Sequence, residues 1–154
     1  MNLTLSSPKP PGTVLQILRA NTAARRPSLW FPSNIREYFN GTITDDTFRI
    51  QRNIQYFNSF LPVIRGRVEP TESGSEIRLK MSIHPLVKAF MAVWFIPLVL
   101  VCVAMLCQTG NPNQVPLPTQ IRLWGLLLFG ILLAIVPFRI EAKKAQEKLE
   151  SLFQ

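Results

Sequence analysis

The sequence predicts an α+β membrane protein, in which a small antiparallel β-rich domain is followed by a two-helix transmembrane hairpin and a short C-terminal helix. Two uncharged apolar runs, residues 90–107 and 123–138, are each close to the length that a helix needs to cross a bilayer. Residues 42–83 instead alternate apolar and polar side chains, which is typical of strands with one buried face. Residues 140–153 place Glu and Lys three or four positions apart, as a solvated helix does.

The first part of the chain has the weakest pattern. Residues 1–13 contain three prolines and a glycine; the prolines remove backbone donors, and the segment is predicted to be a flexible N-terminal lead-in. Residues 13–18 fit either a first strand or the start of a short helix. Ser33 is a suitable N-cap for a short helix over residues 34–39, and Gly41 stands where that helix would end.

A β-rich domain is predicted for residues 14–83, with three or four antiparallel strands. Asp45 and Asp46 predict a tight turn, and residues 69–75 predict a hairpin loop of several residues because they include a proline and a glycine. Residues 53–62 fit a strand or an irregular connection. The apolar sheet face needs a cover, for which the sequence offers six aromatic side chains: Trp30, Phe31, Tyr38, Phe39, Tyr56 and Phe60.

A transmembrane hairpin is predicted for residues 84–138, with spans at about 86–107 and 121–138. Pro97 should kink the first span, because its missing N–H frees a carbonyl one turn back. Cys102 and Cys107 both lie in this span, about 140° apart on a helix, so neither a disulfide nor a metal site is expected between them. The alternative, a buried helix of a soluble domain, would leave these runs without a polar face toward water.

The charge distribution predicts how the hairpin is oriented. Residues 1–83 carry eleven Lys and Arg against six Asp and Glu, and residues 139–154 carry four more cations, whereas the connection between the spans has none before Arg122. Cationic flanks stay on the cytoplasmic side of a membrane. We therefore expect both termini in the cytoplasm, residues 139–154 to form a cytoplasmic helix, and the lipid bilayer to be the first partner of the chain.

Five basic residues are the candidate binding site. Each occupies a polar position of an alternating strand, so one sheet face should collect them: Arg49, Arg65, Arg67, Arg78 and Lys80. Such a face, tethered close to a membrane, favours anionic lipid headgroups, each cation near the surface contributing about 1 kcal/mol. The alternative is an ordinary solvated face.

No catalytic or metal-binding arrangement is visible. His84 is the single histidine, and it fits either a ligand or proton carrier at the membrane boundary or a polar residue at a helix entrance. No nucleophile–base pair, paired carboxylates or glycine-rich phosphate loop can be assembled, and the spans hold no Asp, Glu or His at mid-depth. We expect no enzymatic activity, no cofactor, no metal and no nucleic-acid partner.

Several strings in the middle third of the chain carry a resemblance. They are Phe48-Arg49-Ile50, Asn58-Ser59-Phe60-Leu61-Pro62, Arg65-Gly66-Arg67, Ile77-Arg78-Leu79-Lys80-Met81 and His84-Pro85. With the two spans that follow, this block resembles a group of small bacterial two-span inner-membrane proteins of uncharacterised function. The resemblance implies location in a bacterial inner membrane and brings no activity. The string at 58–62 also fits a structural turn, in which Asn58 bonds the backbone and Pro62 fixes the entry to the next strand.

These observations predict a membrane-anchored, non-enzymatic module that binds a protein partner or anionic lipid at the cytoplasmic face. The alternative is a small oligomeric channel or transporter accessory subunit. A two-helix hairpin cannot enclose a pore alone, so that alternative requires self-association.

Overall fold

The computed structural model describes residues 1–24, 37–107 and 115–154, and it contains two compact units. The first comprises residues 1–84 and 138–154, and we call it the sheet domain. The second comprises residues 85–137, and we call it the helical hairpin. The short helix expected over residues 34–39 lies largely outside the described residues. Its last residue, Phe39, begins a strand instead.

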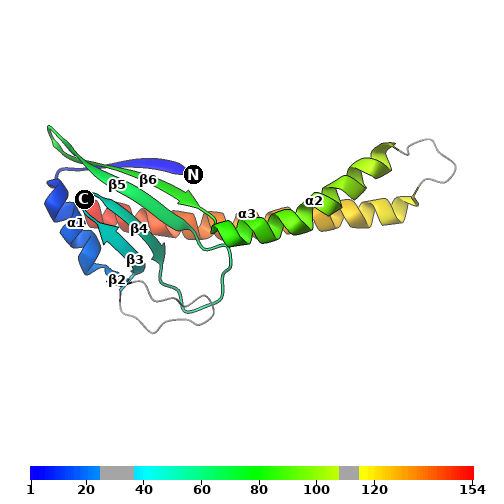
Figure 1. Cartoon of the computed structure of the whole chain (residues 1–154), viewed down its shortest axis with the longest axis horizontal. Helices are drawn as coiled ribbons and strands as arrows, with labels where there is room; N and C mark the ends of the chain where they lie inside the picture. Colours follow the sequence, from blue (N-terminus) through cyan, green and yellow to red (C-terminus); the bar gives the residue numbers. More distant parts are fainter. Residues whose placement is uncertain (25–36, 108–114) are drawn as a thin grey trace. The chain divides into compact units, whose positions relative to one another are not determined.

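A six-stranded mixed sheet forms the first unit (Figure 1), with the strands in the order β1-β6-β5-β4-β3-β2. The central four strands form an antiparallel meander: β3 (Phe39–Thr44), β4 (Thr47–Arg52), β5 (Val63–Thr71) and β6 (Gly74–Ser82). At one edge β1 (Asn2–Ser7) pairs antiparallel with β6, and at the other β2 (Thr22–Ala24) pairs parallel with β3. The sheet thus has more strands than the three or four predicted.

The prediction of a flexible lead-in over residues 1–13 is wrong. β1 pairs with β6 over its whole length, and both Leu5 and Ser7 are buried. The edge of β6 would otherwise expose a row of unpaired backbone groups, which β1 satisfies. The next residues form α1 (Pro11–Ala20), with a proline at its first position and Val14 and Leu18 buried one turn apart. This resolves the choice left open for residues 13–18 in favour of a helix.

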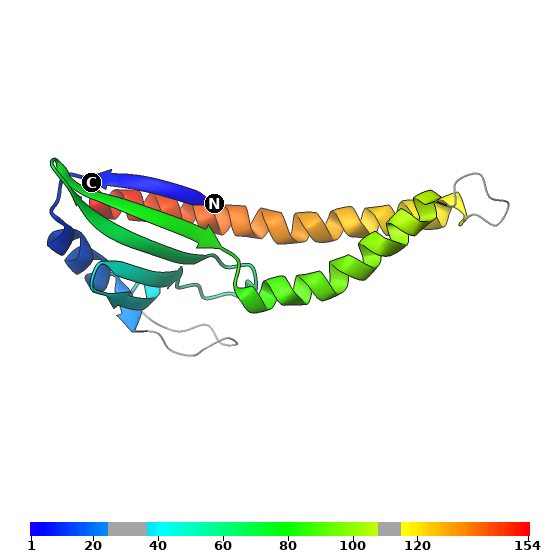
Figure 2. The ribbon, with the colours of Figure 1, turned by 45° about the horizontal axis from the view of Figure 1, so that its top comes forward.

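The core lies on one face of this sheet, which we call the inward face. Figures 1 and 2 show α1 and the C-terminal part of α3 (Leu117–Phe153) covering that face. The α3 stripe recurs every three or four residues, as a helix requires to bury one side: Ala142, Ala145, Leu149 and Phe153. Helices, rather than the aromatic side chains proposed from the sequence, therefore supply most of the cover. Phe39 is fully buried as expected, whereas Trp30 and Phe31 lie outside the described residues.

Both predicted turns exist, but one is tighter than expected. Asp45 and Asp46 form the turn between β3 and β4. Between β5 and β6 only Glu72 and Ser73 form the turn, because β5 continues through Pro70. The backbone of Val68 faces β4, since its N–H bonds to Asp46 O, and Pro70 faces the same way two residues later. The register with β4 has ended by then, so the missing N–H of Pro70 costs no ladder bond.

The chain path gives the sheet domain two distinct ends. At one end β6 finishes at Ser82, opposite Val63, and α2 (Pro85–Cys107) begins three residues later. We call this the proximal end, and we call the end with the Glu72–Ser73 turn the distal end. Within the sheet domain, α3 runs from proximal to distal, because Glu141 contacts Arg52 and the carbonyl of Phe153 accepts a hydrogen bond from Ser7.

The helical hairpin consists of α2 and the first part of α3. Both helices are long and apolar enough to cross a membrane, and most of their large apolar side chains are exposed, for example Trp94, Leu100 and Leu132. They pack closely at Gly130, where a Cβ would lie 2.7 Å from Cζ of Phe95. Pro97 lies within α2, which curves along its length in Figure 2.

The expected break between the second span and the C-terminal helix is absent. α3 begins at Leu117, before the predicted start near residue 121, and continues without interruption through Pro137 to Phe153. A proline inside a helix removes one hydrogen bond and crowds the preceding turn. The residues beyond it are held helical because their apolar stripe is buried against the sheet.

Candidate functional site: a basic face on the sheet

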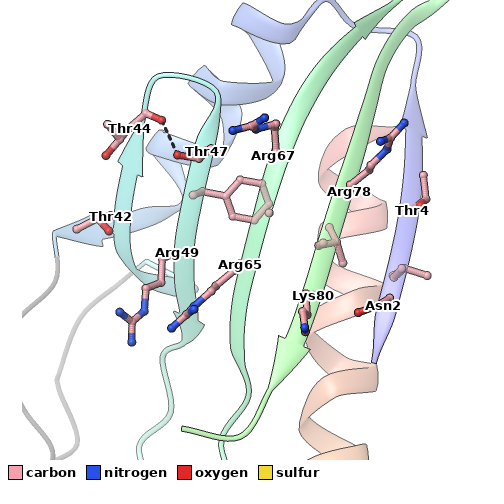
Figure 3. Close-up of a pocket in the computed structure, with 14 residues that line it drawn as sticks. Asn2, Thr4, Thr42, Thr44, Thr47, Arg49, Arg65, Arg67, Arg78 and Lys80 are labelled. Atoms are coloured by element: carbon pink, nitrogen blue, oxygen red, sulfur yellow. Dashed lines mark hydrogen bonds between the residues drawn. The ribbon is translucent and has the colours of Figure 1, made fainter. Parts of the chain in front are cut away.

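All five predicted basic residues lie on the outward face of the sheet, opposite the core (Figure 3). The strand register arranges them in two groups. Arg49, Arg65 and Lys80 stand side by side on β4, β5 and β6, and we call them the proximal row. Arg67 and Arg78 stand opposite each other two residues nearer the distal end, and we call them the distal pair. The alternation read from the sequence therefore places these residues correctly.

The distal pair is neutralised by carboxylates. Arg67 Nε lies 3.2 Å from Asp46 Oδ2, and Arg78 Nη2 lies 3.4 Å from Glu69 Oε2. Arg78 also donates a hydrogen bond to Glu76, and this bond, followed by the charge of Glu69, raises the pKa of Arg78 above its ordinary value. The repulsion between the two guanidinium groups is thus offset locally.

Two members of the proximal row, Arg65 and Lys80, have no such carboxylate among the described residues. Arg49 and Arg65 are directly opposite, and so are Arg65 and Lys80. Like charges in directly opposite positions of a sheet destabilise it. Within the described residues, Arg65 and Lys80 make no ion pair, and both side chains are exposed. Arg65 and Lys80 therefore place two positive charges side by side that no ion pair in the described part of the chain balances.

The proximal row and the distal pair line one shallow hollow of about 730 Å³. Five further lining residues carry hydroxyl or amide groups, namely Asn2, Thr4, Thr42, Thr44 and Thr47 (Figure 3), and Leu3, Phe48, Gly66 and Leu79 complete the lining. The hydroxyl of Thr47 donates a hydrogen bond to the carbonyl oxygen of Thr44, with 3.1 Å between the two oxygens. Guanidinium, ammonium and hydroxyl donors around one hollow suit a phosphate or carboxylate group, which accepts several charge-assisted hydrogen bonds at once. The hollow has the size of common small-molecule sites.

A second charged cluster lies on the inward side and was not predicted from the sequence. Glu141 is almost fully buried, forms an ion pair with Arg52 and accepts a hydrogen bond from the hydroxyl of Tyr56. Lys144 Nζ lies 3.7 Å from Glu141 Oε1. Partial burial first, and then the bond to Glu141, raise the pKa of Tyr56 above its ordinary value. The sequence shows the Glu141–Lys144 spacing, but nothing in it reveals the long-range partners from β4 and the loop after it.

The other residues singled out from the sequence have structural positions. His84 lies in the short connection between β6 and α2. Asn58 accepts a hydrogen bond from the N–H of Phe60 at 2.9 Å, and Pro62 directly precedes β5, so the string at 58–62 forms the predicted turn. In the described part of the chain, no three His, Cys, Asp or Glu side chains gather as a metal site would require.

Comparison with known proteins adds no identification. No model of a known protein family matches the chain, and no curated protein or solved structure is significantly similar to it.

Proposed function

We propose that this chain is a membrane-anchored, non-enzymatic module whose outward sheet face binds anionic phospholipid headgroups. The single observation that carries the proposal is the proximal row, in which two exposed cations, Arg65 and Lys80, face each other without an ion pair in the described structure. Since this arrangement costs folding free energy, an external anion is the simplest reason for it.

The distribution of charge along the strands favours a membrane as the source of that anion. The distal half of the outward face holds Glu69 and Glu76 opposite each other, whereas the charged residues described in the proximal half are the cations Arg49, Arg65 and Lys80. Lys80 is five residues before Pro85, so the chain between them spans at most about 18 Å. Anionic headgroups attract cations within about a Debye length of 8–10 Å, and long side chains extend that reach.

The helical hairpin supplies the anchor in this proposal. Most of its exposed side chains on α2 and on the first part of α3 are apolar, and lipid is the matching solvent for them. We place the protein in a bacterial inner membrane with both termini cytoplasmic, as the positive flanks and the sequence resemblance suggest. A protein partner with an acidic surface is the competing ligand, and the experiment below distinguishes it.

The test uses the full chain in detergent micelles doped with phosphatidylglycerol or phosphatidylcholine, with individual bound lipids counted by native mass spectrometry. The variant Arg65→Gln/Lys80→Gln is compared with Arg19→Gln/Lys143→Gln, which removes the same charge from two exposed positions elsewhere. We expect the first variant to bind phosphatidylglycerol roughly thirtyfold more weakly, at about 1 kcal/mol per cation, and the second to bind like the parent.

Two results would overturn the proposal. One is equal phosphatidylglycerol affinity in both double variants. The other is phosphatidylcholine binding as tight as phosphatidylglycerol binding in the parent. If Arg65→Gln/Lys80→Gln kept its lipid affinity but lost a protein that co-purifies with the parent, the row would belong to a protein partner.

A further inference from the structure

The loop between β4 and β5, residues 53–62, exposes aromatic side chains to an unusual degree. The side chain of Phe57 is 75% exposed, and that of Tyr56 is 48% exposed. Phe57 is the most exposed large apolar residue in the described part of the sheet domain. A phenyl ring in water is unfavourable, and it has no polar group that could compensate.

The large exposed apolar residues in the described part of the sheet domain lie at its proximal end. Four large ones are exposed among its described residues: Met1, Tyr56, Phe57 and Ile140. The carbonyl of Met1 accepts a bond from Met81, one residue before the end of β6, and the loop leads directly into Val63 at the start of β5. Ile140 is three residues after Pro137, where α3 enters the domain. The distal end, with its Glu72–Ser73 turn, has no such residue among those described.

The loop is held in place rather than left loose. The hydroxyl of Tyr56 bonds to the buried carboxylate of Glu141, four residues after Pro137 on α3. Asn58 closes a turn by accepting a bond from the N–H of Phe60, and the N–H of Leu61 bonds back to the carbonyl of Asn58. Phe57 therefore stands between two fixed points, and its exposure is built into the loop.

We propose that residues 53–62 are a second membrane contact, with Phe57 seated in the bilayer interface beside the two points where the chain passes to and from the helical hairpin. Trp and Tyr concentrate at this depth of a membrane, and Tyr56 has the matching character of an apolar ring with a satisfied polar end. Phe57 adds an apolar ring beside it, which lipid would remove from water. The proposal rests on the hairpin being in the bilayer. It adds that the sheet domain is fixed against the membrane by its proximal end, which brings the proximal row to the headgroups.

The experiment places a nitroxide spin label on single cysteines of the full chain, after Cys102→Ala and Cys107→Ala, in nanodiscs of phosphatidylglycerol and phosphatidylcholine. Labels go to Phe57→Cys in the loop, Ser73→Cys in the distal turn and Leu132→Cys on α3. Collision with oxygen, which concentrates in lipid, is compared with collision with a water-soluble nickel chelate. We expect the oxygen-to-nickel ratio to be several-fold higher at position 57 than at position 73, and highest at position 132.

A spin label at Gln55→Cys repeats the measurement in the same loop while Phe57 is kept. Gln55 is exposed and lies in the same loop. The oxygen-to-nickel ratio at position 55 should fall toward that of position 73 when Phe57→Ser is added. The small polar side chain of serine has no affinity for the bilayer interface and cannot hold the loop there. Water exposure at positions 55 and 57 with lipid exposure at 132 would overturn this inference and leave the anchor standing. Water exposure at 132 would overturn both.

Discussion

Arg52 on the inward face of the sheet and the Arg65–Lys80 pair on the outward face differ in how their charges are balanced. On the inward face, Arg52 points toward α3 and is matched by Glu141, with Tyr56 completing the carboxylate's contacts. On the outward face, Arg65 and Lys80 stand exposed in a row of like charge without a carboxylate partner among the described residues. A largely buried cation without a partner destabilises the fold by several kcal/mol, whereas an exposed one costs less and remains available for a ligand. The inward cation is therefore part of the packed core's contacts, whereas the outward pair carries the charge on which the proposed lipid binding rests.

The largest expected effect comes from removing Glu141, the carboxylate that pairs with Arg52 on the inward face. Glu141→Ala should destabilise the sheet domain by about 3–5 kcal/mol, because it leaves the largely buried charge of Arg52 without its carboxylate. Circular dichroism during thermal unfolding of the full chain in detergent would measure the loss. Glu147→Ala, at an exposed position on the same helix, should change the midpoint hardly at all. Comparable losses of thermal stability in Glu141→Ala and Glu147→Ala would show that the ion pair with Arg52 is not important for stability.

The next largest loss of stability is expected when the packing of α3 against the inward face is weakened. Leu149 is fully buried, and Leu149→Ala should cost about 2–5 kcal/mol through lost burial and the cavity that remains. Leu152→Ala, three residues along and only half-buried, should cost clearly less. Protection of the sheet amides from hydrogen exchange would report both variants, and unchanged protection in Leu149→Ala would show that α3 does not hold the sheet.

Gly66 links the two faces, because it lies between Arg65 and Arg67 while its own side-chain position faces inward. A Cβ there would lie 2.3 Å from Cζ of Phe48, so Gly66→Ala should cost about 1–3 kcal/mol by overpacking. Gly12→Ala on α1 is the control, since a Cβ there meets nothing within 4 Å. Chemical denaturation would compare the two. A neutral Gly66→Ala would mean that Phe48 moves without cost.

Tyr56→Phe gives a smaller effect that depends on pH. Loss of the hydroxyl bond to Glu141 should cost about 1 kcal/mol at neutral pH. The pKa of Tyr56 is raised in the folded chain above its ordinary value of 10.0, so the unfolded chain loses this proton first as the pH rises. The stabilisation is therefore complete below pH 10 and fades as the pH rises through the folded pKa. Unfolding midpoints of parent and variant should converge under alkaline conditions, and a constant difference would contradict this account.

The smallest effect belongs to the outward face. Arg65→Gln should raise stability by about 0.2–1 kcal/mol, because it relieves repulsion from its cross-strand neighbours. Arg67→Gln should give no gain, since it also removes the ion pair with Asp46. Denaturation at low and high salt would separate the two variants, and the gain should shrink as salt screens the row. A destabilising Arg65→Gln would show that the row is balanced within the protein.

Much of this arrangement is already present in the sequence. The period-two alternation of β4, β5 and β6 assigned Arg49, Arg65, Arg67, Arg78 and Lys80 to one face, because successive side chains of a strand point to opposite sides. The long apolar runs predicted the helices of the hairpin for a similarly local reason. The composition of residues 1–13 did not predict β1. The prolines of this segment follow the strand rather than interrupt it, and the strand forms by pairing with the edge of β6, which is distant in the sequence.

What the sequence determined by itself is therefore periodicity: which residues share a strand face and which stretches are apolar enough to form long helices. Only the tertiary structure decided which cations are paired. Arg52 and Glu141 are 89 residues apart, and Tyr56 and Glu141 are 85 apart, so no local pattern joins them. The same long-range packing extended α3 through Pro137 and gathered the exposed apolar residues at one end of the domain. Pairing and burial depend on which distant segments meet, and local spacing does not contain that information.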